Sequence, residues 1–465
     1  MAAATPNTAL AALQSHLREQ HPSIRLITPS DADFESARAC FIRLDGDDVS
    51  SAPLAIARPQ TAADVQALVR YCVAGKLDFV VRVGGHDCAG RSQVGGALTI
   101  DLRDIKHVVV NSGEQDGTKT ARVGGGVLFR DLARELDARG LVTAVGTVAS
   151  VGFTGWASLG GYGPFANHFG LGADQIVGAK IVNAKGELVD ADAELLKGIR
   201  GGGGIFGIIV ETTIKVYPLK EILLSMVVFE STDLKAAWTS YAAGYEKLLA
   251  EESVPRALQL QPFGLEFPGM GKVFAVGATW SLPDHDEGRR WIAKVAGFGN
   301  CIMNNPEAKS VTSYVEFNET LIAFGLYGQA YTLNFKKLTP KTAEVLAKHT
   351  ALSPAGMAVS VHRLREPAAN EGSVFGSRVD HHMLEIIAMT PVKDLEAKGA
   401  EWARGVISEL KEADPDNILD SSYVSLQGDD ADYRKVYGPH YDTLVALKKK
   451  LDPENVFKYA VPRLQ

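Results

Sequence analysis

The stretch Arg82-Val-Gly-Gly-His-Asp-Cys-Ala-Gly-Arg-Ser92 decides the interpretation of this chain, because one histidine follows directly after two glycines. Before it lies an apolar, β-branched run, residues 79–83, which is typical of a buried strand. Glycines let a backbone approach a large anionic ligand, and consecutive N–H groups can bind its phosphates. His86 adds a nucleophilic imidazole. The stretch favours a pyrophosphate-binding turn with a point of covalent attachment. The alternative is a tight turn that carries a surface histidine.

Three more segments belong with this turn. Residues 145–163 interleave glycines with small residues and aromatics, and residues 200–211 run from four consecutive glycines into a predicted strand. The last segment is Leu451-Asp-Pro-Glu-Asn-Val-Phe457, close to the C-terminus. In this order the four segments resemble the FAD-linked oxidases of the vanillyl-alcohol oxidase and p-cresol methylhydroxylase superfamily. The resemblance is strongest to the berberine-bridge-enzyme-like branch, which includes the 6-hydroxy-D-nicotine oxidases.

The resemblance implies an α+β fold in which a two-part FAD-binding domain of the p-cresol methylhydroxylase type holds an inserted substrate domain. The implied domains are residues 1–220 for FAD, 221–419 for substrate, and 420–465 as a berberine-bridge-like return to the FAD-binding domain. FAD is the implied cofactor. The middle of the chain resembles the family much less closely than the two ends do.

Local patterns agree with this division. Apolar spacing predicts helices over 7–20 and 59–72, with Thr61 as the N-cap of the second. Many short strands and a hairpin over 175–190 fill the remainder of the first 220 residues. Beyond 221, strands and helices come in blocks, which favours an antiparallel sheet with helices on one face. The expected strands there are 222–229, 274–280, 330–334, 359–362 and 383–390, and the expected helices are 234–249, 339–349, 394–413 and 441–451.

Composition narrows the function classes. The 465 residues carry a net charge of −7 and 46% hydrophobic residues, which argues for a globular protein and against a nucleic-acid binder. The longest basic run, Lys448-Lys-Lys450, is expected on the solvated face of a helix. No signal peptide or membrane-spanning run is visible, so a cytoplasmic protein is expected. Four cysteines without CxxC spacing predict neither a disulfide framework nor a metal site.

Two patterns invite a different interpretation. Residues 202–207 satisfy GxGxxG and residues 161–166 its GxGxxA variant, but a Rossmann site needs a strand before the glycines and a helix after them. The first pattern has the reverse order, and the second has a proline where a helix would begin. His381-His382 is predicted to be one buried and one exposed histidine on opposite faces of a strand rather than a metal site.

The resemblance assigns the flavin contacts residue by residue. His86 takes the position of the histidine that forms an 8α bond to the flavin. Val148 stands where many relatives have a second, cysteinyl attachment, so one covalent bond is expected. We call residues 82–92 the first glycine cluster and residues 145–163 the second. The histidine that the branch commonly has in the second glycine cluster is absent at Thr154-Gly-Trp156. The implied cofactor-binding residues are Arg82, Val83, Gly84, Gly85, His86, Asp87, Ser92, Gly146, Thr147, Gly152, Gly155, Trp156, Gly160, Gly161, Gly207 and Ile209.

Three more positions concern the chemistry. By the resemblance, Phe153 takes the position beside flavin C4a that is usually valine or leucine. We expect the bulkier ring to restrict oxygen, and oxidase and dehydrogenase both stay open. Tyr423, in Tyr-Val-Ser425, matches the tyrosine of the family's Tyr-x-Asn motif and is the expected base. The alternative for Tyr423 is a core tyrosine on a strand. His440 is either a second titratable group near the flavin or, as we favour, a surface residue at a helix start.

The function that the resemblance implies is FAD-dependent oxidation of a small organic alcohol, amine or related C–H bond of the secondary-metabolite kind, by hydride transfer to covalently bound FAD. Its partners are a small-molecule substrate and, as one option, molecular oxygen. The alternative is a non-redox cyclase or metabolite-binding protein that keeps FAD as a structural element.

Overall fold

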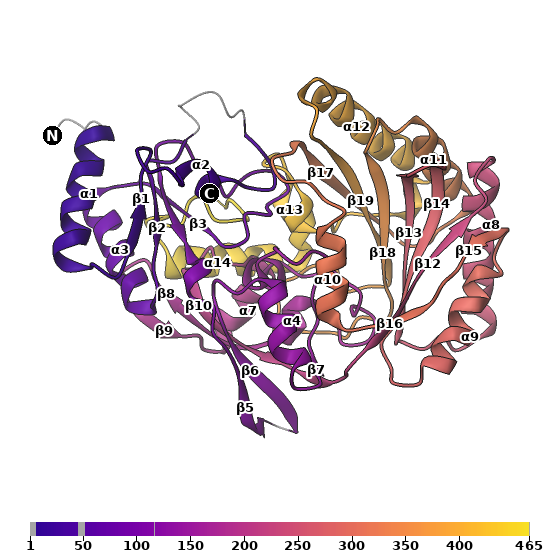
Figure 1. Ribbon diagram of the computed structural model, residues 1–465, viewed down its shortest axis with the longest axis horizontal. Helices are drawn as coiled ribbons and strands as arrows, with labels where there is room; N and C mark the ends of the chain where they lie inside the picture. The colour runs from indigo at the N-terminus through magenta and orange to yellow at the C-terminus, as the bar shows by residue number, and fades with distance from the viewer. Residues whose placement is uncertain (1–5, 45–51, 116, 465) are drawn as a thin grey trace.

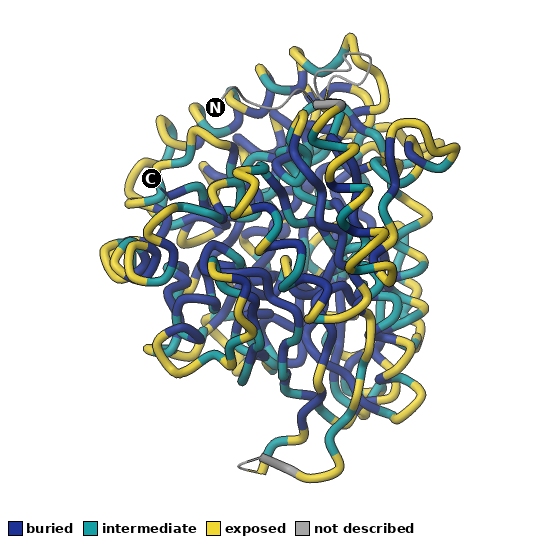
Figure 2. Tube along the Cα trace, turned by 90° about the vertical axis from the view of Figure 1, so that its left-hand side faces the viewer, coloured by how far each residue is buried: buried dark blue, intermediate teal, exposed yellow. Residues whose placement is uncertain are grey.

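The computed structural model describes residues 6–44, 52–115 and 117–464. It has two parts side by side: smaller sheets from the first 218 residues, and one large antiparallel sheet from the middle of the chain (Figure 1). We call residues 6–218 the N-terminal region, 222–419 the large-sheet region and 420–464 the C-terminal return. Buried residues lie in the interior and exposed residues around the outside (Figure 2).

Two sheets form most of the N-terminal region. In the first, of order β1-β2-β4-β3, β4 pairs in parallel with β2 and with β3, and the second, of order β5-β6-β10-β8-β9, is antiparallel. The strands are β1 (Arg25–Ile27), β2 (Ala55–Arg58), β3 (Phe79–Arg82), β4 (Leu98–Asp101), β5 (Val108–Gln115), β6 (Thr118–Gly124), β8 (Ile176–Val182), β9 (Leu188–Asp190) and β10 (Ile208–Lys215), with β7 (Leu141–Val142) and β11 (Tyr217–Pro218) as a separate pair.

Helices cover these sheets, and the predicted cap of one of them is confirmed. Thr61 accepts a hydrogen bond from the backbone N–H of Asp64 at 3.2 Å, and the Asp64 carboxylate accepts one from the Thr61 N–H at 3.0 Å. The helices are α1 (Pro6–Gln20), α2 (Phe34–Arg38), α3 (Ala62–Gly75), α4 (Phe129–Asp137), α5 (Phe153–Ser158), α6 (Gly172–Gln175) and α7 (Ala193–Gly202).

The GxGxxG pattern at 202–207 lies where helix α7 ends and before strand β10 begins. This is the reverse of the order that a dinucleotide-binding turn needs, so the rejection of a Rossmann site is confirmed.

The nine-stranded sheet organises the large-sheet region, with helices α8, α9, α11 and α12 on one face (Figure 1). Its strands are β12 (Ile222–Phe229), β13 (Leu258–Phe267), β14 (Gly271–Trp280), β15 (Cys301–Met303), β16 (Glu307–Lys309), β17 (Tyr327–Phe335), β18 (Ala358–Leu364), β19 (His381–Thr390) and β20 (Ile418–Leu419). The helices are α8 (Leu234–Glu251), α9 (His285–Ala296), α10 (Val311–Glu319), α11 (Pro340–Leu352) and α12 (Glu396–Ala413). All these strands lie within residues 222–419, but the domain boundaries themselves stay a prediction.

The two histidines of β19 correct one expectation. They do face opposite sides of the sheet. Nε2 of His381 accepts a hydrogen bond from the Tyr162 hydroxyl at 2.7 Å, and the His382 ring stacks on Phe335 with ring centroids 5.0 Å apart. Both are buried, however, because the N-terminal region covers one face of the sheet and the helices cover the other. Within the described residues, no three His, Cys, Asp or Glu side chains gather into a potential metal site.

The C-terminal return comprises α13 (Tyr433–Tyr437) and α14 (Tyr441–Leu451) and packs against the N-terminal region. Its Leu-Asp-Pro-Glu-Asn-Val-Phe motif depends on Asp452, whose buried carboxylate accepts the Lys448 ammonium at 2.6 Å and the backbone N–H groups of Val456 and Phe457 at 2.8 and 3.0 Å. The prediction of a solvated lysine triplet is therefore wrong for Lys448. Its ammonium also donates to the carbonyl of Ile205 at 2.9 Å.

Two glycines let the first and second glycine clusters touch along their backbones. A Cβ on Gly84 would lie 2.2 Å from the carbonyl oxygen of Ser150, and a Cβ on Gly152 would lie 2.6 Å from the Val83 side chain. No larger residue fits either position without moving one of the two segments. The turn that carries His86 is thus held directly on the second cluster.

None of the helices in the described part of the chain is both long and apolar enough to cross a bilayer.

We expect Asp452→Ala to destabilise the protein strongly, because it leaves a buried ammonium and two backbone N–H groups without their acceptor. Breaking such a buried pair costs about 3–5 kcal/mol in the free energy of unfolding, measurable by urea denaturation. Lys450→Ala on the same helix is the control, since its ion pair with Glu194 is exposed. Equal losses for the two variants would contradict the role given to Asp452.

Candidate functional site

A cavity of about 960 Å³ lies between the two parts of the molecule. It is at the upper end of the 300–1,000 Å³ that small-molecule and cofactor sites usually have. One wall comes from the turn after β3 and from the second glycine cluster, and the opposite wall comes from β12, β13, β14, β18 and β19 of the large sheet. Residues from the C-terminal return, among them Tyr423 and Phe457, also line the cavity. Its size and its position between two sheets suit a large, elongated ligand.

The cavity gathers most of the residues that the sequence indicated, from four separate segments. Gly160 and Gly161 do not line it: a Cβ at Gly160 would lie 2.4 Å from the Phe375 ring, and one at Gly161 would lie 2.8 Å from the Gly172 backbone. These two glycines are explained by close packing. The lining residues from the prediction are Arg82, Val83, Gly84, Gly85, His86, Asp87, Ser92, Gly146, Thr147, Gly152, Gly155, Trp156, Gly207, Ile209 and Tyr423.

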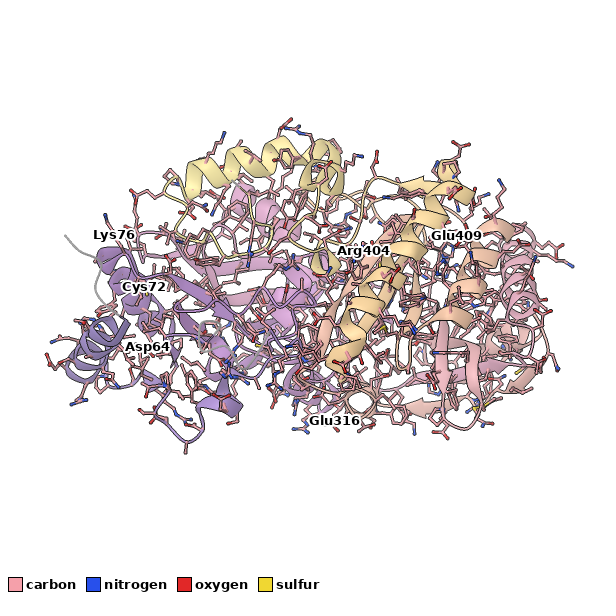
Figure 3. All side chains as sticks on the ribbon, turned by 90° about the horizontal axis from the view of Figure 1, so that it is seen from above. Asp64, Cys72, Lys76, Glu316, Arg404 and Glu409 are labelled. Atoms are coloured by element: carbon pink, nitrogen blue, oxygen red, sulfur yellow. The ribbon has the colours of Figure 1, made fainter. Side chains whose placement is uncertain are left out.

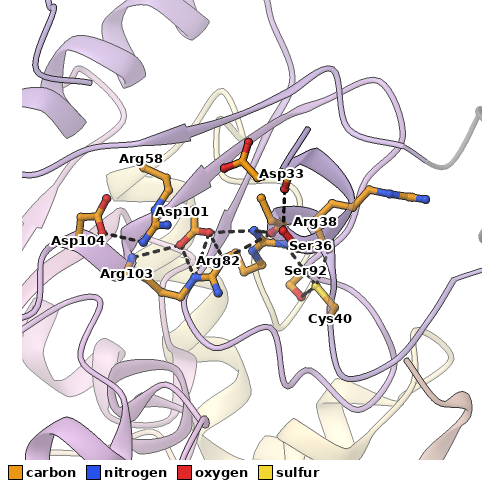
Figure 4. Close-up of polar contacts among 11 residues, drawn as sticks. Asp33, Ser36, Arg38, Cys40, Arg58, Arg82, Ser92, Asp101, Arg103 and Asp104 are labelled. Atoms are coloured by element: carbon orange, nitrogen blue, oxygen red, sulfur yellow. Dashed lines mark hydrogen bonds and ion pairs between the residues drawn. The ribbon is translucent and has the colours of Figure 1, made fainter. Parts of the chain in front are cut away.

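Arg82 borders the cavity, but its guanidinium is used within the protein. It donates to the fully buried carboxylate of Asp101 at 2.8 Å and to the Arg38 carbonyl at 3.0 Å, and Arg103 reaches the same carboxylate at 2.6 Å (Figure 4). The two guanidinium groups hold the pKa of Asp101 below its usual value despite burial, which would raise it. Arg82 therefore joins the ends of β3 and β4 instead of offering a free charge to a ligand.

Asp87 likewise shapes the turn. Its carboxylate accepts the backbone N–H of Ala89 at 3.1 Å and that of Arg91 at 2.8 Å, and the Arg91 guanidinium pairs with it at 2.8 Å. These bonds fold the chain back on itself directly after His86.

The His86 ring is held from several sides. Its Nε2 lies 2.7 Å from the Ser150 hydroxyl, its face stacks on Phe41 with centroids 4.8 Å apart, and the Phe324 ring meets it at 5.0 Å in a T-shaped contact. Burial lowers the pKa of His86 to about 4, an effect that the Glu319 carboxylate partly opposes. The ring is therefore neutral at pH 7, and one nitrogen keeps a lone pair.

Unsatisfied polar atoms and an open glycine show that the cavity suits a polar ligand. The buried Thr154 hydroxyl and the Nη1 atom of Arg91 have no protein partner, and both residues line the cavity. A Cβ at Gly155 would meet no atom within 4 Å. Since packing does not require a glycine there, its missing side chain leaves room beside the cavity.

The sheet wall supplies polar groups that the sequence did not single out. Alternate residues of β13 and β19 face the cavity, among them Gln259, Gln261 and Glu385, while their neighbours pack under the helices. The Glu385 carboxylate lies 3.2 Å from Nε2 of His362 on the adjacent strand. Period-two spacing alone could not reveal Glu385, because it does not say which face of a strand is covered by a ligand site.

Tyr423 lies on the same side of the cavity as Glu385 and Cys88. It precedes a short 3₁₀ turn over Val424–Leu426, so the expected strand position is corrected: the last strand, β20, ends at Leu419. Its ring meets that of Tyr162 at 4.9 Å. Burial is the main cause that raises the pKa of Tyr423, and the nearby Cys88 and Glu385 raise it further.

Tyr162 extends this polar group to the sheet. The Nδ1–H of His381 donates to the Val379 carbonyl at 2.7 Å, so its Nε2 must accept the Tyr162 hydroxyl. The Tyr162 proton is thereby directed away from the cavity.

Two expected site residues lie elsewhere. His440 is half-buried at the start of α14 and does not line the cavity, which agrees with the helix-start alternative. Phe153 is fully buried at the start of α5 and packs on Phe129 and Trp156. Because Phe153 does not line the cavity, its place in the structure favours a packing role, and the expectation that it restricts oxygen stays a prediction.

Comparison with known proteins identifies this arrangement. Residues 53–192 match the family described as FAD binding domain, and residues 422–461 match berberine and berberine like. An FAD-linked oxidoreductase of Gibberella zeae, aurO, is 33% identical over 458 residues, which cover 96% of this chain and 87% of the relative. The chain belongs to the berberine-bridge-enzyme-like FAD-linked oxidoreductases.

Solved structures agree on the fold of this oxidoreductase. The 6-hydroxy-D-nicotine oxidase of Arthrobacter nicotinovorans has a TM-score of 0.79 at 23% identity, covering 94% of this chain and 96% of the other. The glucooligosaccharide oxidase of Acremonium strictum has a TM-score of 0.77 at 19% identity, covering 97% and 98%. The predicted α+β fold, the FAD cofactor and the enzyme class are confirmed.

The position of Phe153 gives a test that separates packing from oxygen access. We expect Phe153→Val to lower the free energy of unfolding by about 2–4 kcal/mol, because it opens a void between two aromatic rings. Stopped-flow reoxidation of the reduced flavin should stay at the wild-type rate. A clear acceleration with unchanged stability would support the oxygen-gating role instead.

Proposed function

We propose that this FAD-dependent oxidoreductase oxidises a C–H bond next to oxygen or nitrogen in a small organic alcohol or amine, with molecular oxygen as the acceptor. FAD supplies the hydride acceptor when bound. The supporting observation is that one cavity joins the glycine-rich turns to a wall carrying Glu385 and Tyr423. The non-redox alternative is not favoured, because the relatives are named oxidoreductases and oxidases.

The cavity narrows the substrate's shape. Beyond Glu385, apolar side chains line the sheet wall and the α10 side, including Met383, Ile387, Met389 and Phe317. Such surfaces favour a flat or branched apolar molecule over a highly charged one. The few polar groups would orient its reacting carbon.

We further propose that Glu385 is the proton acceptor and that Tyr423 binds the substrate heteroatom. A phenol whose pKa is raised by burial stays protonated at neutral pH, so it donates a hydrogen bond more readily than it removes a proton. The Glu385 carboxylate lines the same cavity, 3.2 Å from Nε2 of His362, which can take the proton onward. This replaces the sequence-based preference for Tyr423 as the base.

The proposal also includes one covalent bond between His86 and FAD. His86 lines the cavity with a neutral imidazole, and Val148 offers no second nucleophile. The glucooligosaccharide oxidase carries a 6-S-cysteinyl, 8α-N1-histidyl FAD, so histidyl attachment occurs within this fold.

We expect the purified protein to be yellow and to keep its flavin in the pellet after acid precipitation. Peptide mass spectrometry should find the FAD adduct on the peptide that contains His86. His86→Ala should move the flavin to the supernatant, whereas His107→Ala, which alters a histidine outside the cavity lining, should not. An adduct on a cysteine would contradict the single attachment.

We expect Glu385→Gln to slow anaerobic flavin reduction by about 10²–10⁴, the usual range for loss of a general base. The substrate is an alcohol or amine that the wild-type protein turns over, selected by screening a panel of such compounds. Flavin reduction by this substrate is followed by stopped flow. Tyr423→Phe should mainly weaken substrate binding, with a smaller effect on the limiting rate. Glu307→Gln is the matched control, since its carboxylate also borders the cavity but is exposed and pairs with Lys309. A larger rate loss for Tyr423→Phe than for Glu385→Gln would return the base to the tyrosine.

A further inference from the structure

Helix α10 of the large-sheet region lies against helix α4 of the N-terminal region (Figure 1). Three polar contacts repeat along the two helices. The Asp137 carboxylate accepts the Thr312 N–H at 2.8 Å, Arg134 donates to Glu316 at 3.1 Å, and Arg130 lies 3.5 Å from Glu319. Glu316 is seen at the junction of the two parts in Figure 3. The first two contacts only join the two helices. The third involves Glu319, which also contacts a residue beside His86.

Glu319 also holds Ser150 through two hydrogen bonds. One of its carboxylate oxygens accepts the backbone N–H of Ser150 at 2.9 Å and the Ser150 hydroxyl at 2.8 Å. The same hydroxyl lies 2.7 Å from Nε2 of His86. A continuous chain of hydrogen bonds therefore runs from His86 through Ser150 to Glu319, and Arg130 lies at its end.

The direction of each proton in this chain follows from the groups present. An ionised carboxylate can only accept, so the Ser150 hydroxyl donates its proton to Glu319. The serine oxygen is then left to accept from His86, which places the imidazole proton on Nε2. The lone pair must be on Nδ1, since the tautomer of a neutral histidine is set by the hydrogen bond at its other nitrogen.

We propose that Ser150 and Glu319 are positioning residues for covalent flavin attachment, which fix His86 as the Nδ1 nucleophile and stabilise the charge that it acquires. This inference rests on the proposed His86–FAD bond. The arrangement has the logic of a nucleophile oriented by a second and a third group. Because Glu319 belongs to α10, the large-sheet region completes the attachment site of the FAD-binding part.

Nδ1 of His86 forms a bond to the 8α carbon of the flavin, and one C–H bond of that methyl group breaks. The proton and the two electrons of that bond pass to the flavin. Dioxygen then takes the two electrons, that proton and one further proton from water, which gives hydrogen peroxide and returns the flavin to its oxidised form. The imidazole becomes a cation that keeps its proton on Nε2. Ser150 faces that proton, and the Glu319 carboxylate supplies the opposing charge.

The experiment follows covalent attachment directly. Full-length apoprotein from riboflavin-starved cells is mixed with FAD, and the flavin in the acid-precipitated pellet is measured against time. We expect Ser150→Ala and Glu319→Gln to slow attachment at least about tenfold, in line with the cost of losing an outer orienting group. Ser150→Thr keeps the hydroxyl and should attach FAD at close to the wild-type rate. Glu316→Gln is the matched control, because it makes the same change one turn away on α10 without touching Ser150.

Total bound flavin, measured before acid treatment, shows whether each variant folds and binds FAD. Attachment at the wild-type rate in Ser150→Ala would overturn the positioning role. Equal slowing in Glu316→Gln and Glu319→Gln would also overturn it, because helix docking alone would then explain the effect. Wild-type protein that binds FAD but never retains it in the pellet would instead contradict the covalent bond of the proposed function.

Discussion

The close approach of Gly84 to the backbone at Ser150–Gly152 is the constraint on which the rest of the site depends. Two segments separated by more than sixty residues touch there with no side chain between them. The contact brings the His86 turn against the second glycine cluster, and both then line the same cavity. Asp101 and Arg82 hold the turn from behind, at the ends of two parallel strands. Backbone packing therefore fixes where the turn that carries His86 lies, and the Ser150 hydroxyl and the Phe41 and Phe324 rings hold the imidazole itself.

The sequence predicted the frame of the molecule well, because its signals are local. Thr61 and Asp64 indicate the start of a helix within four residues. The glycine-rich turns indicate where two segments of backbone pack closely against each other. The inward or outward direction of single side chains was harder to predict. Phe153 faces the core, and Lys448 is buried because Asp452 and the Ile205 carbonyl satisfy its charge.

Site residues could be predicted only where a single short segment of sequence identifies them. His86 could be identified from its own turn. The role of Glu319, in contrast, comes from contacts with Ser150 and Arg130, which lie 169 and 189 residues away in the chain, and that of Glu385 comes from the cavity that the large sheet shares with the N-terminal region. His381 and His382 make the same point, since their opposite directions followed from the strand but their shared burial followed from what covers each face. Sequence reasoning supplies periodicity, but which layers pack on a sheet is settled by the whole fold.

The alternation of the large sheet has an evolutionary consequence. On β13 and β19, residues facing the cavity alternate with residues packed under the helices. Of two adjacent positions, one is therefore constrained by the ligand in the cavity and the other by the packing of the helices. Replacing Gln261 or Ile387 would change the shape of the cavity without opening a void beneath α8 or α12. Selection can thus change what the enzyme accepts while the helix-facing set, such as Leu260 and Ile386, stays constant. A fold that separates these two sets along each strand can diversify its chemistry at little risk to its own folding.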